Sequence, residues 1–118
     1  MNNRKVGTDW EEKTASYLES RGMQILERNF RCRTGEIDLI GRYRGYLVFV
    51  EVKYRSSPEK GNAAEAVDYR KQRQICRVAD FYRLCHGLGE DTPVRYDVVA
   101  VTGEKIEWIE NAFCHMLR

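Results

Sequence analysis

The stretch GEIDLIGRYRGYLVFVEVKYR, residues 35–55, decides the fold of this chain. Apolar residues alternate with other residues along both of its halves, and a period of two is typical of strands. Arg44 and Gly45 stand between the halves as a short turn. The stretch therefore predicts a β-hairpin.

A two-residue turn fixes the register of this hairpin, and the register gathers charge on one face. It places Asp38 across from Glu51. It also places Glu36 across from Lys53. The opposite face is apolar and consists of Ile37, Leu39, Val48, Val50 and Val52. Two facing acids repel each other, which costs up to roughly 1 kcal/mol, so a compensating group is expected and a divalent cation is the simplest.

Two tyrosines flank the turn of the hairpin. Tyr43 and Tyr46 are candidates for stacking on a base, for packing on a second subunit, or for plain exposure at a turn.

Length and composition indicate one soluble globular domain spanning residues 1–118. The chain is 42% hydrophobic and 32% charged, with a net charge of +2 that does not by itself indicate a nucleic-acid-binding protein. Neither an apolar leader nor a membrane-length run of ~18 apolar residues is visible. Four cysteines lack zinc-ligand spacing and are expected to be reduced thiols. We therefore expect a cytoplasmic protein without a membrane partner.

The N-terminal part predicts a helix near residues 8–21, in which Asp9 precedes the apolar run and Gly22 closes the helix. Glu11 lies in line with the apolar positions of this helix, whereas Glu12 points towards water. An acid on the packing side of a helix needs a reason, so Glu11 is a candidate site residue.

The rest of the chain predicts a mixed sheet flanked by two helices. Residues 23–30 form a strand, in which the broken alternation over 28–31 indicates a bend or an edge. The polar segment 56–65 forms a mobile loop. The further expected elements are the longest helix over 63–85, strands over 94–101 and 106–109, and a C-terminal tail that is a candidate helix. The order αβββαββ is that of an α/β sandwich.

The second helix is strongly basic. Its candidate nucleic-acid-binding residues are Arg70, Lys71, Arg73 and Arg77. Taken singly, each is better explained as part of a solvated helix face. As a set beside an acidic hairpin, they indicate contacts with phosphates.

The acids of the hairpin match the chemistry of a metal-dependent hydrolase. Asp38, Glu51 and the carbonyl of Val52 can present hard oxygens to Mg²⁺ or Mn²⁺. Glu11 could add another oxygen, directly or through water. Lys53 projects from the same side of the strand as Glu51, where it can stabilise charge that develops on a phosphate. The chemistry that fits is phosphodiester hydrolysis, and the alternative is a set of ordinary salt bridges.

The helix with Glu11, the motifs GEIDLI (35–40) and VFVEVKYR (48–55), and the later RYDVVAV and IEWIENAF closely resemble the YraN family of small bacterial proteins. That family is similar to the PD-(D/E)XK nuclease superfamily and, in its core, to archaeal Holliday junction resolvases. The resemblance implies an αβββαβ core flanked by helices. It places Asp38, Glu51 and Lys53 at the positions of the catalytic Asp, Glu and Lys.

The resemblance carries further expectations. Glu11 takes the position of the acid of the first helix, with Glu12 as the alternative. Arg55 and Lys71 match recurring positions and are candidates for phosphate contact. The superfamily's proline is replaced by Ile37, and Trp10 stands where the family usually has glycine.

The leading hypothesis is a Mg²⁺- or Mn²⁺-dependent endonuclease that acts on DNA, branched or structured DNA included. The alternative is a nucleic-acid-binding module of nuclease fold without activity of its own. Junction resolvases act as dimers because a four-way junction has two symmetric strands to cut, so a homodimer is also an expectation.

Overall fold

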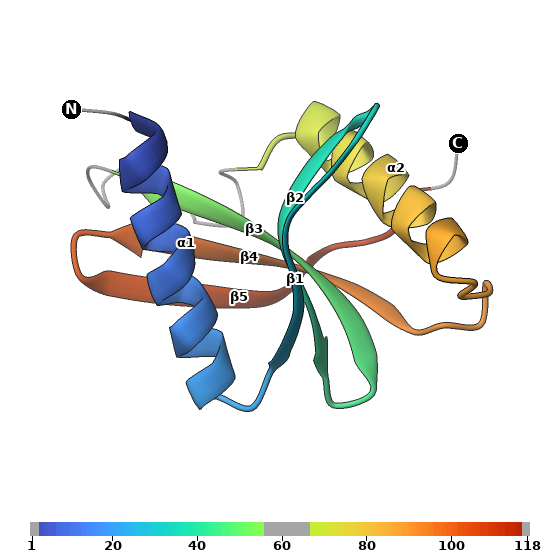
Figure 1. Cartoon of the computed structure of the whole chain (residues 1–118), viewed down its shortest axis with the longest axis horizontal. Coiled ribbons are helices and arrows are strands. Elements are labelled where there is room, and N and C mark those ends of the chain that lie inside the picture. Colours follow the sequence, from blue (N-terminus) through green and yellow to red (C-terminus); the bar gives the residue numbers. More distant parts are fainter. Residues whose placement is uncertain (1–2, 56–66, 117–118) are drawn as a thin grey trace.

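The computed structural model describes residues 3–55 and 67–116, which form two helices and one five-stranded sheet in the order αβββαββ (Figure 1). The elements are α1 (Asn3–Ser20), β1 (Gln24–Cys32), β2 (Gly35–Tyr43), β3 (Tyr46–Arg55), α2 (Tyr69–Cys85), β4 (Val94–Thr102) and β5 (Lys105–Phe113). The strands lie in the order β1-β2-β3-β4-β5, and only β3 and β4 are parallel to each other. The predicted α/β class with a mixed sheet is confirmed.

The central hairpin has the predicted turn and register. Tyr43 pairs with Tyr46, and Arg44 and Gly45 have φ values of 50° and 85°. A two-residue turn with both φ angles positive matches the right-handed twist of the flanking strands, and glycine adopts such an angle without strain. The local sequence alone is therefore enough to set this register.

The hairpin opens at its far end. Pairing between β2 and β3 stops at Leu39 and Val50, while β2 stays paired with β1 as far as Gly35 and β3 stays paired with β4 as far as Arg55. In Figure 1 the β1–β2 hairpin rises towards α2, whereas β3 and β4 run on beneath α1. The sheet is thus forked, and the acidic residues of the hairpin lie where the fork begins.

Each helix covers one of two apolar clusters. Leu39, Val48 and Val50 pack with α1, as the alternation predicts. Ile37 does not join them, because it is buried in the cluster beneath α2 together with Phe49. The prediction for Ile37 is wrong because β2 leaves β3 after Leu39, so the simple alternation of faces ends there.

Several predicted boundaries need correction. The first helix begins at Asn3 rather than at residue 8, and with 18 residues it is longer than α2, which has 17. The second helix begins at Tyr69, where the side chain of Asp68 caps it by accepting a hydrogen bond from the amide of Lys71. The expected loop 56–65 and the expected helix start at 63 lie outside the described residues.

The C-terminal part also differs from the prediction. The last strand extends from Lys105 to Phe113, and residues 114–116 are not helical. Tyr43 is buried against Trp108, with ring centroids 5.2 Å apart. Only Tyr46 is an exposed turn tyrosine.

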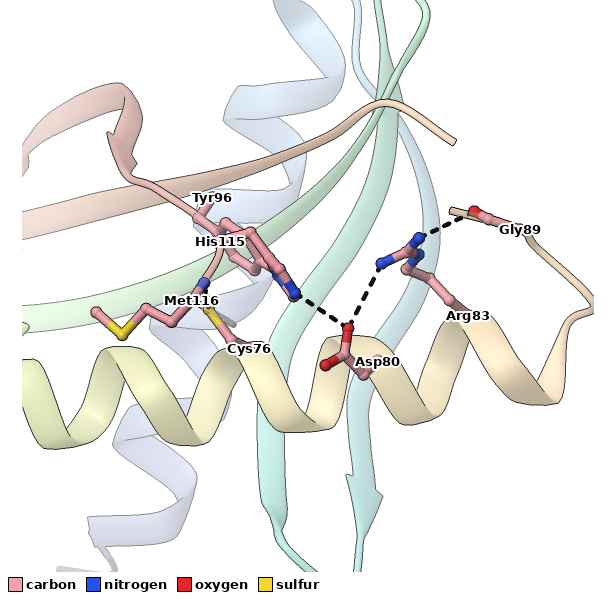
Figure 2. A network of polar contacts seen from close by, with 7 residues as sticks. All are labelled: Cys76, Asp80, Arg83, Gly89, Tyr96, His115 and Met116. Atoms are coloured by element: carbon pink, nitrogen blue, oxygen red, sulfur yellow. Dashed lines mark hydrogen bonds and ion pairs between the residues drawn. The ribbon is translucent and has the colours of Figure 1, made fainter. Parts of the chain in front are cut away.

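A polar network fastens the segment after β5 to α2 (Figure 2). The Tyr96 hydroxyl lies 2.6 Å from Nδ1 of His115, and burial raises the pKa of Tyr96 far above its ordinary value, so this hydroxyl keeps its proton. Nε2 of His115 lies 3.3 Å from Asp80. Asp80 also pairs with Arg83, which donates to the carbonyl of Gly89. These contacts hold the middle of α2 in place against the sheet.

Candidate active site

Asp38 and Glu51 lie together at the fork of the sheet. The β2–β3 ladder ends at the Leu39–Val50 pair, just before these two acids. The amide of Val52 therefore donates to the carboxylate of Asp38, at 2.8 Å, instead of to a backbone carbonyl of β2. Glu51 is buried, with 9% of its surface exposed. The two acids are close enough for each to influence the pKa of the other. The predicted proximity of Asp38 and Glu51 is confirmed.

Glu11 joins this pair from α1. It is half-buried, while its neighbours Thr14, Ala15 and Leu18 are fully buried, as the helical period predicts. Glu12, the alternative acid, is exposed and pairs with Arg28 of β1. Three carboxylates from three elements therefore converge.

The three carboxylates of this cluster all have raised pKa values. Burial, followed by the charge of Asp38, raises the pKa of Glu51 to about 8 and that of Glu11 to about 7. Burial also raises the pKa of Asp38, against the opposing effect of the Val52 amide. Acids that share a buried volume resist ionising together, so the site favours either added protons or an added cation.

Lys71 is the cation that the fold brings to these acids. Its Nζ lies 3.7 Å from Oε2 of Glu51. The sequence predicts phosphate contact for Lys71 and gives no signal for a contact with Glu51. This pairing depends on how α2 packs across the sheet. Lys53 and Arg31 also lower pKa values in this cluster, but burial and the neighbouring acids outweigh these cations at Glu11 and Glu51.

Lys53 is exposed on β3 and is close enough to lower the pKa of Glu51. Its predicted cross-strand partner is wrong. Lys53 pairs with Ala100 of β4, and Glu36 pairs with Arg31 of β1, with 3.2 Å between the charged groups. Opening of the fork separates the two strands before the expected Glu36–Lys53 position.

The donor set fits a hard divalent cation, although the described residues contain no ready group of three Asp, Glu, His or Cys side chains in metal-binding geometry. Mg²⁺ is typically bound through one or two carboxylates and keeps several waters. Asp38 and Glu51 supply such a pair of oxygen donors, next to the backbone of Val52 and near Glu11. Burial is the main cause of the raised pKa values of these acids, and a cation bound among them would lower those values.

The remaining predicted residues lie outside this cluster. Arg70, Arg73 and Arg77 are exposed and recur at spacings of three and four residues, so they share one face of α2. Arg73 also lies over the ring of Tyr69, 5.9 Å from its centroid. Arg55 ends β3 and is half-buried opposite Thr102 of β4.

Comparison with known proteins identifies the family. The family model described as "Uncharacterised protein family UPF0102" matches residues 10–101. The chain belongs to the UPF0102 family. This confirms the resemblance to the YraN family, which is the same family.

Relatives in the UPF0102 family match along almost the whole chain. A UPF0102 protein of Lachnoclostridium phytofermentans is 51% identical over 113 residues, covering 96% of each chain. One of Aliivibrio salmonicida is 46% identical, covering 94% of this chain and 93% of the relative. One of Caldanaerobacter subterraneus subsp. tengcongensis is 42% identical, covering 96% and 98%.

In this UPF0102 protein the tip of the β1–β2 hairpin is docked on α2, which the sequence did not reveal. Nε2 of Gln74 donates to the carbonyl of Thr34, at 3.0 Å. Gly35 allows this approach, because a Cβ there would lie 2.7 Å from the same Gln74 nitrogen and its φ of 150° suits glycine. The only signal in the sequence was a glycine immediately before the acidic motif.

A polar hollow of about 430 Å³ lies between this hairpin tip and the first turns of α2. It is lined by Arg31, Cys32, Gly35, Glu36, Lys71 and Gln74. Lys71 also contacts Glu51, and Glu36 raises the pKa of Asp38. The polar hollow therefore adjoins the carboxylate cluster.

Neither α1 nor α2, among the residues described, combines the length and apolar character needed to cross a membrane.

Proposed function

We propose that this protein is a metal-dependent endonuclease that hydrolyses phosphodiester bonds in DNA, branched or structured DNA included. The observation that supports this most is the meeting of Glu11, Asp38 and Glu51 at the fork of the sheet, with little positive charge to balance them. The position of the acids on the second and third strands of an αβββαβ core agrees with the resemblance to PD-(D/E)XK nucleases.

The roles of the residues follow from their positions. Asp38, Glu51 and the backbone oxygen of Val52 would hold Mg²⁺ or Mn²⁺, with Glu11 as a further oxygen donor, directly or through water. A bound ion of this kind supplies Lewis acidity and lowers the pKa of water for attack on a phosphodiester. The amide of Val52 holds the Asp38 carboxylate in a fixed orientation.

Cations of the chain complete the proposal. Lys53, near Glu51 but exposed, can stabilise the charge of the scissile phosphate. Lys71 forms an ion pair with Glu51 from α2. Arg55 and the arginines of α2 would bind phosphates further along the strand.

Purified protein with plasmid, flap and four-way junction substrates in Mg²⁺ and in Mn²⁺ tests this proposal. We expect cleavage by the wild type, with losses of roughly 100-fold or more in Asp38→Ala and Glu51→Gln and a clear loss in Lys53→Ala. Glu12→Gln is the matched control, because Glu12 lies on the same helix as Glu11 but faces away. No cleavage by the wild type, or equal cleavage by Asp38→Ala and Lys53→Ala, would reject the proposal.

A second candidate is a nucleic-acid-binding module without hydrolytic activity. The exposed face of α2 formed by Arg70, Arg73 and Arg77 supports it. This function predicts salt-dependent DNA binding that survives Asp38→Ala and weakens when these arginines and Lys71 are neutralised. Binding that is unchanged in the quadruple variant would exclude it.

A further inference from the structure

A second hollow lies beside the polar one, on the other side of the point where the hairpin tip contacts α2. Its volume is about 380 Å³. The end of β1 and the turn after it form one wall, with Cys32, Arg33 and Thr34. Helix α2 forms the other wall, with Arg77, Phe81 and Leu84. We call it the apolar hollow.

Two large apolar side chains, Phe81 and Leu84, are exposed in this hollow and belong to neither apolar cluster of the core. Phe81 is 44% exposed and Leu84 is 77% exposed. The Phe81 ring is tilted against that of Phe30, with ring centroids 6.3 Å apart. An aromatic ring open to solvent inside a hollow of this size offers a flat surface on which another ring could stack.

The charges around the apolar hollow suit an anionic ligand. Arg33 and Arg77 are both exposed at its walls. Asp80 is the one acid among the described residues that lines it, and it is already engaged by Arg83 at 3.4 Å and by His115 at 3.3 Å (Figure 2). The hollow therefore presents two arginines and a largely compensated carboxylate.

The two hollows are neighbours along α2, and the polar hollow adjoins the candidate site. Cys32 lines both, and the polar hollow reaches Lys71, which contacts Glu51. A ligand that spans them would meet carboxylates, then cations, then an aromatic ring. Nucleic-acid strands alternate in the same way between anionic phosphates and flat bases.

We propose that the apolar hollow binds an unpaired nucleobase next to Phe81, while the neighbouring phosphate occupies the polar hollow. This inference rests on the proposed function and deepens it, because it specifies a strand with at least one unstacked base, such as single-stranded or flapped DNA. A base within a duplex would first have to leave its stack, so a fully paired duplex binds less well.

Binding in the presence of EDTA tests this inference without any cleavage. Fluorescence anisotropy would compare a single strand, a flap and a blunt duplex of the same sequence. We expect the single strand and the flap to bind about tenfold or more tightly than the duplex, and Phe81→Ala to lose about tenfold in affinity for the unpaired substrates alone. Phe81→Trp should retain that affinity, because it keeps an aromatic face.

Tyr46→Ala is the matched control, since Tyr46 is similarly exposed at 41% but lies at the β2–β3 turn. Thermal unfolding of each variant establishes that it is folded. A second readout is photocrosslinking from a single strand that carries 5-iodouracil, with the crosslinked peptide expected to contain Phe81. Equal binding of duplex and single strand, or single-strand binding unchanged in Phe81→Ala and Leu84→Ser, would overturn the inference.

The outcomes separate this inference from the proposed function. Single-strand binding that depends on Phe81, without cleavage of any substrate, supports the base-binding hollow and rejects the nuclease. Cleavage in Mg²⁺ that is indifferent to base pairing and to Phe81 supports the nuclease and overturns the hollow. Sedimentation that shows Phe81→Ala dissociating a dimer, with DNA binding unchanged, would assign the hollow to a second copy of the chain and also overturn the inference.

Discussion

Asp97 and the Asp38–Glu51 pair are buried acids of the same sheet in opposite situations. Asp97 is 1% exposed and accepts two hydrogen bonds from Arg95, at 2.9 and 2.7 Å. It also accepts one from Nε1 of Trp108, at 2.8 Å, and one from the amide of Asn111, at 2.9 Å. Asp97 is thus fully satisfied by the protein itself.

The Asp38–Glu51 pair lacks such partners. Asp38 accepts a hydrogen bond from the amide of Val52, and Glu51 has Lys71 at 3.7 Å. Burial, to which the charge of neighbouring acids adds, still raises the pKa of both. A satisfied buried acid stabilises one conformation, whereas an unbalanced buried cluster is a feature of functional sites. The contrast supports a structural role for Asp97 and a functional role for the Asp38–Glu51 pair.

The largest effect on stability is expected from removing the satisfied acid. Asp97→Ala leaves the half-buried guanidinium of Arg95 without its main acid partner, and Glu110 remains at 3.3 Å. The free energy of unfolding should fall by about 3–5 kcal/mol, as measured by urea denaturation. A loss below about 1 kcal/mol would mean that Asp97 is less important than its hydrogen bonds indicate.

Replacing Glu51 should increase the stability of the protein at high pH in the absence of divalent cations, in contrast to the loss expected for Asp97→Ala. The pKa of Glu51 is raised in the folded state, so the folded protein is most stable while Glu51 is protonated, and it loses stability as pH rises from about 4.5 towards about 8. Glu51→Gln should flatten this decline and, at pH 8, be more stable than the wild type by on the order of 1–3 kcal/mol. Denaturation curves at pH 5 and pH 8 in EDTA measure both values, and a variant less stable than the wild type at pH 8 would contradict the electrostatic argument.

A divalent cation should stabilise the Asp38–Glu51 pair, as the hydrogen bonds of the protein stabilise Asp97. Mn²⁺ or Mg²⁺ at about 100 times its dissociation constant would stabilise the wild type by about 2.7 kcal/mol, which raises Tm by several degrees. Asp38→Asn and Glu51→Gln should lose this increase, because each removes a donor. Differential scanning calorimetry at pH 7.5 tests it, and the absence of any Tm shift or heat of binding with millimolar Mn²⁺ would favour purely structural acids.

The smallest effect is expected at the neighbouring outward acid. Glu12→Gln breaks an exposed ion pair with Arg28, and such pairs contribute about 0–1 kcal/mol. Stability should change by less than about 1 kcal/mol and the Mn²⁺ response should not change. Loss of the Mn²⁺ response in Glu12→Gln would indicate that Glu12, and not Glu11, is the acid of α1 that contributes to metal binding.

Some of the site could be predicted because it depends on short-range geometry. The turn at Arg44 and Gly45 sets the register that brings Asp38 to Glu51, and the helical period turns Glu11 inward. The partner of Lys71 could not be predicted, since residues 51 and 71 meet only through packing of α2 across the sheet. The Glu36–Lys53 pairing failed for a related reason, because it assumed that the hairpin stays closed.

Sequence by itself determined the strands, the tight turn and the identity of the acids, because each of these depends on residues a few positions apart. Tertiary structure alone decided where β2 separates from β3, which cation reaches Glu51, and that two hollows lie between the β1–β2 tip and α2. These three features depend on how the helices pack against the twisted sheet. Such packing is a property of the whole chain and is not encoded in any single motif.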